Sequence, residues 1–220
     1  MTWDLRAPHR STIDRVPIAA VLFDFGGVIT TSPFEAFARY EETNGLPSDF
    51  LRRVNATDPD TNAWAQLERN EIDLAGFDAA FAEESSRLGH HVRGGDVLGL
   101  LSGDLRPSMV RAVEVIAPRM KTGLLTNNVV GMDPSGAIAD VVSHFDVVIE
   151  SSVVGVRKPD PAFYELACER LAIDPTEAVF LDDLGVNLKP ARALGMQTIK
   201  VGDPATALAE LERILGFPVR

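Results

Sequence analysis

The second half of the sequence alternates short apolar runs with segments of helical periodicity, and this alternation limits the folds that the chain can adopt. The apolar runs predict strands at 122–125, 147–149, 178–181 and 197–201. Helical spacing predicts helices at 108–117, 134–142, 161–171, 187–194 and 204–215. Strands that alternate with helices of this length form a parallel sheet with helices on both faces. The sequence therefore predicts an α/β fold built on a doubly wound parallel sheet.

A further buried strand is expected near the N-terminus, in the stretch VLFDFGGVI at 21–29. Its apolar run ends in one carboxylate, Asp24, and Gly26 and Gly27 then allow the chain to turn sharply. By itself the stretch could be a simple strand-end turn. As the end of a parallel strand, it would deliver the Asp24 side chain to the crevice at the carboxyl edge of the sheet, where such sheets bind ligands. Residues 1–16 are expected to form a poorly ordered leader.

Between the first strand and the others, the periodicity is helical. Helices are expected at 34–44, 48–54, 61–70 and 74–88, and no strand pattern interrupts them. We therefore expect an α/β core at 17–33 and 106–220, with a helical insert at 34–105 that could cover the crevice near Asp24. The charged pairs Glu41-Glu42 and Glu83-Glu84 are expected on solvent-facing helix surfaces.

Composition narrows the range of partners. The chain has 21 Lys and Arg residues against 32 Asp and Glu residues, a formal charge of −11, which disfavours nucleic acid as a partner. No apolar run approaches the length of a membrane span. We expect a cytoplasmic protein that binds a small molecule. It could be a monomer or a homodimer, since the insert could bury its apolar side on the core or on a second subunit.

Polar residues that follow the predicted strands are expected to converge on one site. They are Asp24, Thr126, Asn127, Lys158 and the pair Asp182-Asp183. Three carboxylates this close would repel one another unless a cation lay between them, and Mg²⁺ suits such ligands. Lys158 would supply a fixed positive charge, while Thr126 and Asn127 would donate hydrogen bonds to phosphate oxygens.

These residues, in this order, resemble the motifs of the haloacid dehalogenase superfamily of aspartate-nucleophile hydrolases. The stretches IESSVVGVRKPDP and VFLDDLGVNLKPARALGMQTIKV are similar to the phosphatase domain of soluble epoxide hydrolases and to the related domain fused to some acyl-CoA dehydrogenases. The resemblance implies strand order 5-4-1-2-3, a helical cap, and Mg²⁺-dependent phosphoryl transfer from a small phosphorylated metabolite through an aspartyl-phosphate.

The resemblance also implies roles for single residues. Asp24 would attack phosphorus, and Asp182 or Asp183 would hold Mg²⁺ together with the Asp24 carboxylate and the backbone carbonyl of Gly26. Asn187 matches a position close to the metal ligands.

The chain departs from the family pattern at Gly26, where phosphatases of the family carry a second aspartate that acts as general acid and base. Such assistance contributes about 10²- to 10⁴-fold in rate, so substrates with acidic leaving groups should suffer least. A cap residue or an ordered water could replace the missing acid, and the candidate residues are Thr30, Thr31 and Glu71. Three functions follow: a Mg²⁺-dependent phosphatase or phosphotransferase, a non-catalytic domain that binds a ligand or partner, and an enzyme that hydrolyses carbon–halogen bonds, for which Gly26 would be harmless.

Overall fold

The computed structural model describes residues 16–130 and 135–220. Five parallel strands form one sheet in the order β3-β2-β1-β4-β5. They are β1 (Ala20–Phe23), β2 (Lys121–Thr126), β3 (Val147–Glu150), β4 (Ala178–Asp182) and β5 (Gln197–Lys200). Read from its other edge, this is the expected order 5-4-1-2-3, so the predicted sheet is confirmed. The expected leader lies outside the described residues, apart from its last residue.

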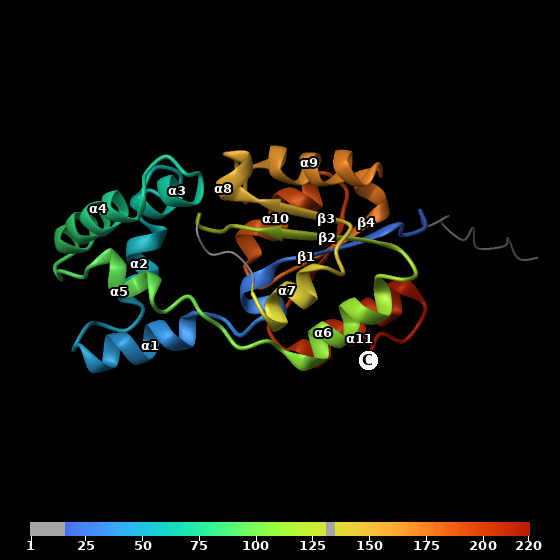
Figure 1. The fold of residues 1–220 in the computed structure, drawn as a ribbon, viewed down its shortest axis with the longest axis horizontal. Coiled ribbons are helices and arrows are strands. Elements are labelled where there is room, and N and C mark those ends of the chain that lie inside the picture. Colours follow the sequence, from blue (N-terminus) through green and yellow to red (C-terminus); the bar gives the residue numbers. More distant parts are fainter. Residues whose placement is uncertain (1–15, 131–134) are drawn as a thin grey trace, which may run out of the picture.

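Helices cover both faces of the sheet (Figure 1). One face carries α6 (Pro107–Ile116), α7 (Ala137–Val142) and α11 (Pro204–Leu215), and the other carries α9 (Pro161–Leu171) and α10 (Gly185–Ala193). In β1, Val21 and Phe23 pack toward the first group, whereas Ala20 and Leu22 pack toward the second. Because side chains alternate along a strand and both faces are buried, the strand sequence is apolar throughout.

The helical insert lies beyond one end of the sheet (Figure 1). It contains α1 (Phe34–Thr43), α2 (Phe50–Ala56), α3 (Ala63–Glu68), α4 (Leu74–Arg87) and α5 (Gly94–Leu98). These helices enclose an apolar cluster of their own, which includes Phe50, Phe77 and Phe81. The chain leaves and re-enters the core side by side, since Thr30 and Leu105 form an antiparallel bridge. One residue from the core side, Val129, is buried in the cluster of the insert.

Two short helices were not predicted from the sequence, and α2, α3 and α10 each begin two residues away from the expected start. The helices α5 and α8 (Ser151–Val154) have five and four residues, too few to show a period of 3.6. Helix α10 begins at Gly185, two residues before the expected start at Asn187. In the described ranges, no helix combines the length and the hydropathy that a membrane span requires.

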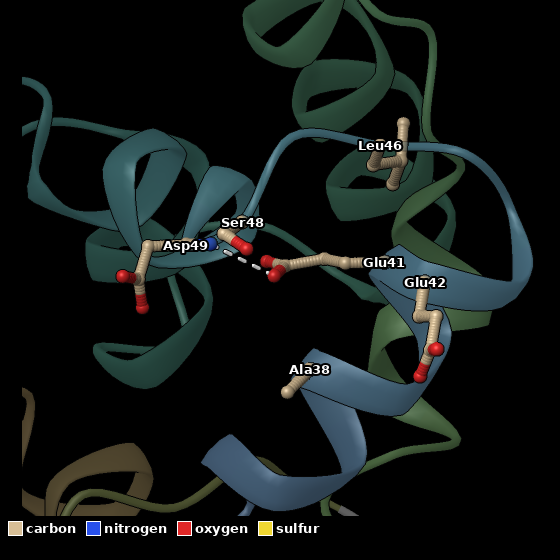
Figure 2. Close-up of a pocket in the computed structure, with 6 residues that line it drawn as sticks. All are labelled: Ala38, Glu41, Glu42, Leu46, Ser48 and Asp49. Carbon is tan, nitrogen blue, oxygen red and sulfur yellow. Dashed lines mark hydrogen bonds between the residues drawn. The ribbon is translucent and has the colours of Figure 1, made fainter.

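The expectation that Glu41 lies on a solvent-facing helix surface is wrong. The Glu41 side chain is buried, and its carboxylate accepts a 2.9 Å hydrogen bond from the backbone N–H group of Asp49 (Figure 2). It accepts a second bond of 2.9 Å from the backbone N–H group of Leu51. Asp49 has a positive φ of 59° and forms no side-chain cap of its own, so Glu41 of α1 satisfies the start of α2 instead. Glu42 is exposed, as expected. The same pattern recurs in the second pair, where Glu84 accepts a 2.8 Å bond from Ala63 N at the start of α3.

Candidate active site

Strand register brings Asp24 and Asp182 together. Phe23 of β1 is paired with Leu181 of β4, so the next residues of the two strands, both aspartates, are neighbours at the carboxyl edge of the sheet. The Asp24 backbone N–H continues the ladder with a 2.9 Å bond to Leu181 O. Alternation then directs both carboxylates to the α9 and α10 face, because Leu22 and Phe180, two residues earlier in each strand, pack there.

Lys158 bridges this pair of carboxylates. Its Nζ lies 2.7 Å from Asp24 Oδ1 and 2.9 Å from Asp182 Oδ2, and its side chain is 1% exposed. The ammonium also lies 5.6 Å from the centre of the Phe180 ring, within the range of a cation–π contact. Burial alone would lower the pKa of Lys158, but Asp182 and Asp24 outweigh it and raise the pKa. Lys158 is therefore held as a cation at the Asp24 carboxylate.

The two adjacent aspartates have different surroundings. Asp182 is fully buried and, besides Lys158, accepts hydrogen bonds from Leu184 N at 2.8 Å and from Asn187 Nδ2 at 3.1 and 3.0 Å. Asp183 is only partly buried, and its carboxylate receives no hydrogen bond from another described residue. Asp182 thus has its lone pairs occupied by the protein, whereas the Asp183 oxygens are available to a ligand.

Asp24, Asp182 and Asp183 together fit a metal site. One carboxylate oxygen from each lies within 4.8 Å of the others. Burial raises the pKa of Asp24 to about 8, against the attraction of Lys158 and with a contribution from Asp182. Burial and the Asp182 charge raise the pKa of Asp183 to about 6. Hard divalent cations take such oxygen ligands, and a cation here would restore the ionised form of both carboxyls.

Asn127 contacts the backbone of Lys158 through both polar atoms of its side-chain amide. Its Nδ2 donates to Lys158 O at 3.0 Å and its Oδ1 accepts from Lys158 N at 2.9 Å. The amide therefore holds the Lys158 backbone at both its N–H and its carbonyl, and the contact expected between Asn127 and phosphate oxygens stays a prediction. Thr126 ends β2, and no described residue is hydrogen bonded to its hydroxyl.

The two glycines after Asp24 play different parts. Gly26 has an ordinary backbone conformation, with φ −69° and ψ 126°, and a Cβ added there would meet no atom within 4 Å. Gly27 has φ 79°, and an added Cβ would overlap the Asp183 carboxylate, whose Cγ would lie 2.5 Å away. Glycine is thus sterically required at Gly27 but not at Gly26.

A crevice between the insert and the core opens beside these residues. It has a volume of about 420 Å³, and its lining includes Gly27 and Asp183 from the core, Phe34 and Arg52 from the insert, and Arg106. A larger hollow of about 540 Å³, between α1 and the start of α2, lies wholly on the insert (Figure 2). The smaller crevice is therefore the one that reaches the site, through Asp183.

The residues considered as substitutes for the missing acid are engaged by their neighbours. The Thr30 hydroxyl donates to Thr31 O at 3.2 Å, and the Thr31 hydroxyl accepts from Asp104 N at 3.0 Å. Glu71 forms a half-exposed ion pair of 2.7 Å with Arg69. These contacts hold none of the three toward Asp24.

Sequence reasoning missed two residues that support the site. The Tyr164 hydroxyl of α9, fully buried, donates to Asn187 O at 2.7 Å and so fixes the start of α10. Arg106 Nη1 donates to Gly27 O at 2.8 Å and steadies the turn after Asp24. A tyrosine on the apolar side of a predicted helix is a weak signal for the contact between Tyr164 and Asn187. No local signal in the sequence points to the contact between Arg106 and Gly27.

The chain is similar to known proteins over most of its length. A family model described as haloacid dehalogenase-like hydrolase matches residues 18–195. The chain is 37% identical over 206 residues to acyl-CoA dehydrogenase family member 10 of Mus musculus, covering 91% of this chain and 19% of that protein. It is 33% identical over 215 residues to bifunctional epoxide hydrolase 2 of Mus musculus, covering 89% and 39%. The chain thus spans about a fifth and about two fifths of these relatives.

One relative of similar length is a phosphatase by name. The chain is 28% identical over 203 residues to phosphatase MT3486 of Mycobacterium tuberculosis (strain CDC 1551 / Oshkosh), covering 84% of this chain and 87% of that protein. Among solved structures, a haloacid dehalogenase family enzyme of Bacteroides thetaiotaomicron in complex with magnesium and inorganic phosphate has the same fold. Its TM-score is 0.59 at 21% identity, covering 84% of this chain and 96% of that one.

Proposed function

The chain belongs to the haloacid dehalogenase-like hydrolases, and from that premise we propose that it is a Mg²⁺-dependent phosphatase with Asp24 as nucleophile. The observation that carries this proposal is the contact between Asp24 Oδ1 and Lys158 Nζ at 2.7 Å, next to a second, ligand-accessible carboxylate at Asp183. A nucleophilic carboxylate must approach a phosphoryl group that is itself negatively charged. A buried cation beside it lowers that repulsion.

In the proposed reaction, an Asp24 carboxylate oxygen forms a bond to phosphorus while the bond from phosphorus to the leaving-group oxygen breaks. The leaving oxygen keeps the electron pair. Water then attacks phosphorus in the aspartyl-phosphate, and the bond from phosphorus to the Asp24 oxygen breaks. This step releases inorganic phosphate and the Asp24 carboxylate, and the proton that the water loses passes to the departed leaving-group oxygen or to solvent. Lys158 and the Thr126 hydroxyl bind the phosphoryl oxygens, and the Asn127 side chain acts by holding the Lys158 backbone in place.

The metal site fits Mg²⁺ through its oxygen donors. Asp24, Asp183 and the backbone carbonyl of Gly26 would hold the ion, and Asp182 would support it by holding Lys158 and Asn187. When bound, Mg²⁺ supplies positive charge to the phosphoryl oxygens and orients the phosphate. We propose that residues 34–105 act as a cap that selects the substrate, a small phosphorylated metabolite.

Gly26 sets the kind of leaving group that this site handles best. No carboxyl stands at that position to protonate the leaving oxygen, so its departure depends on its own acidity. Acyl and aryl phosphates should be hydrolysed faster than alkyl phosphates, by a margin of the order of 10²-fold or more. The relatives support phosphatase chemistry in general terms, since one is called a phosphatase and another neighbour binds magnesium and phosphate.

The test is hydrolysis of acetyl phosphate and p-nitrophenyl phosphate with and without Mg²⁺, for the parent protein and Asp24→Asn. We expect turnover that requires both Mg²⁺ and Asp24. Turnover that persists in Asp24→Asn would reject Asp24 as the nucleophile. Mg²⁺ binding without turnover would favour the second candidate, a domain that recognises a phosphorylated ligand, for which Gly26 is the supporting observation. Metal-independent release of halide from 2-haloacids would favour carbon–halogen hydrolysis, which gives Asp183 no purpose beside Asp24.

A further inference from the structure

A buried ion pair joins the insert to the residue that precedes Lys158. Arg157 Nε lies 2.6 Å from Glu68 Oε2, and the two side chains are 18% and 8% exposed. Glu68 is the last residue of α3, in the insert, whereas Arg157 belongs to the core loop before α9. Burial raises the pKa of Glu68, and the charge of Arg157 is the largest influence that opposes this shift.

The same arginine makes a second contact with the insert. Arg157 Nη1 donates a 2.9 Å hydrogen bond to Pro59 O, in the loop between α2 and α3. The Arg157 guanidinium therefore contacts two separate segments of the insert, the end of α3 and the loop before it. Among the described residues, the other ion pairs outside the active site join partners within the insert or within the core, as Arg93 and Asp78 do. Those pairs are also more exposed on at least one side, where ion pairs contribute little.

Arg157 directly precedes Lys158 in the chain, so its contacts with the insert bear on the position of Lys158. Lys158, the next residue, has its backbone clamped by Asn127 and its ammonium bound to Asp24 and Asp182. Helix α3 lies against α8, on the same side of the molecule. Val129, which follows the Thr126 loop, is buried in the apolar cluster of the insert. Both loops that carry proposed phosphate-binding residues thus have one residue anchored in the insert.

We propose that Arg157 is a positioning residue that docks the insert onto the Lys158 loop through Glu68. The pair holds the insert over the crevice, so the crevice and the phosphoryl site keep one geometry. Its catalytic consequence rests on the proposed phosphatase function, but the docking itself does not. Removing either partner leaves a buried charge without its counter-ion, which favours separation of the insert from the core.

The docking can be measured without turnover, by the distance between two nitroxide spin labels. The labels are placed through Glu83→Cys on α4 and Glu169→Cys on α9, two exposed positions, in a Cys168→Ala background. We expect one narrow distance distribution in the parent. Arg157→Gln and Glu68→Gln should each broaden it, and the double variant should broaden it no further than either single variant. Arg93→Gln, which removes an ion pair within the insert, is the matched control and should leave the distribution unchanged.

Kinetics supply a second readout. Because Lys158 keeps its own contacts with Asp24 and Asp182, Arg157→Gln should raise KM for p-nitrophenyl phosphate about tenfold and lower kcat less than about threefold. A narrow, unchanged distance distribution in both single variants would overturn the proposal, as would broadening that is additive in the double variant. Should Arg157→Gln fail to fold, Glu68→Gln removes the same pair from the other side. Absence of turnover in the parent protein would count against the proposed function, while the distances between the spin labels would still test the docking.

Discussion

The Lys158 ammonium lies 2.7 Å from the Asp24 carboxylate, and the two side chains are 1% and 10% exposed. Asp182 and Asp24 together compensate the buried Lys158 charge, and Lys158 is the main group that opposes the rise in the pKa of Asp24. Lys158→Met should lower the rate of hydrolysis at least about 10²-fold, because the Asp24 carboxylate would face the phosphoryl group without a counter-charge. It should also lower the free energy of unfolding by about 3 kcal/mol in the absence of metal.

The measurements for Lys158→Met are hydrolysis of p-nitrophenyl phosphate and urea unfolding in EDTA. Lys189→Met is the control, because it makes the same substitution at an exposed lysine of α10. Equal activity of the two variants would show that the Lys158 charge is not needed.

Asp182 and Asp183 should respond differently to the same substitution. Asp182→Asn sets an amide against the donors Lys158 Nζ, Leu184 N and Asn187 Nδ2, so the free energy of unfolding should fall by about 3 kcal/mol. Asp183→Asn should change it by less than about 1 kcal/mol yet weaken Mg²⁺ binding at least tenfold, since the Asp183 oxygens are the ones available to a ligand. Urea unfolding and calorimetric titration with Mg²⁺ separate the two effects. A reversed pattern would assign direct metal binding to Asp182.

Magnesium affinity should rise with pH. Without metal, the pKa of Asp24 is raised to about 8 and that of Asp183 to about 6. Below these values the carboxyls are protonated, and Mg²⁺ must displace those protons. Affinity should therefore increase from pH 6 to pH 8, by up to about tenfold per pH unit for each proton displaced, and level off above pH 8.

Calorimetry in two buffers of different ionisation enthalpy counts the protons released on Mg²⁺ binding. Asp24→Asn should remove the dependence between pH 7 and pH 8. An affinity that stays constant from pH 6 to pH 9 in the parent would contradict the prediction.

Gly26→Asp should restore the general acid without harming the fold, because its backbone is ordinary and a Cβ there meets no atom within 4 Å. We expect kcat/KM for butyl phosphate to rise about 10²-fold, and for acetyl phosphate to change far less, since only the poor leaving group needs the proton. Parallel kinetics with both substrates test this. An equal gain for both would point to a binding effect.

Gly27→Ala is the steric counterpart of that substitution. The added methyl would overlap the Asp183 carboxylate at a residue with φ 79°, so Mg²⁺ affinity and stability should both fall. The expected loss of stability is about 1 to 3 kcal/mol by thermal or urea unfolding. Unchanged Mg²⁺ binding in Gly27→Ala would mean that Asp183 can move without consequence.

Glu41 and Glu42 offer a matched pair within the insert. Glu41→Ala leaves two backbone N–H groups at the start of α2 without their acceptor, which should lower stability by about 1 to 3 kcal/mol. Glu42→Ala removes an exposed carboxylate and should change stability by less than about 0.5 kcal/mol. Urea unfolding of both variants is the measurement, and equal stabilities would show that the Glu41 bonds are not significant.

The sequence by itself determined the sheet and the placement of its polar ends. Hydrophobic periodicity is local, so the alternation after Pro107 was enough to predict a parallel sheet with helices on both faces, and the resemblance to a known family supplied its strand order. Asp24 and Asp182 each end an apolar strand, and the carboxyl ends of parallel strands share one edge, so their proximity could be predicted too. The roles assigned to these residues stay predictions.

Only the tertiary structure decided which atoms are used by the protein and which are left for a ligand. That Asp182 is saturated while its neighbour Asp183 is open follows from how α10 packs and where Asn187 points. Asn127 clamps Lys158, Glu41 caps α2 and Arg157 reaches Glu68 through side-chain directions that no local pattern records. Such contacts join residues far apart in the chain, and their partners are set only once the core and the insert have packed.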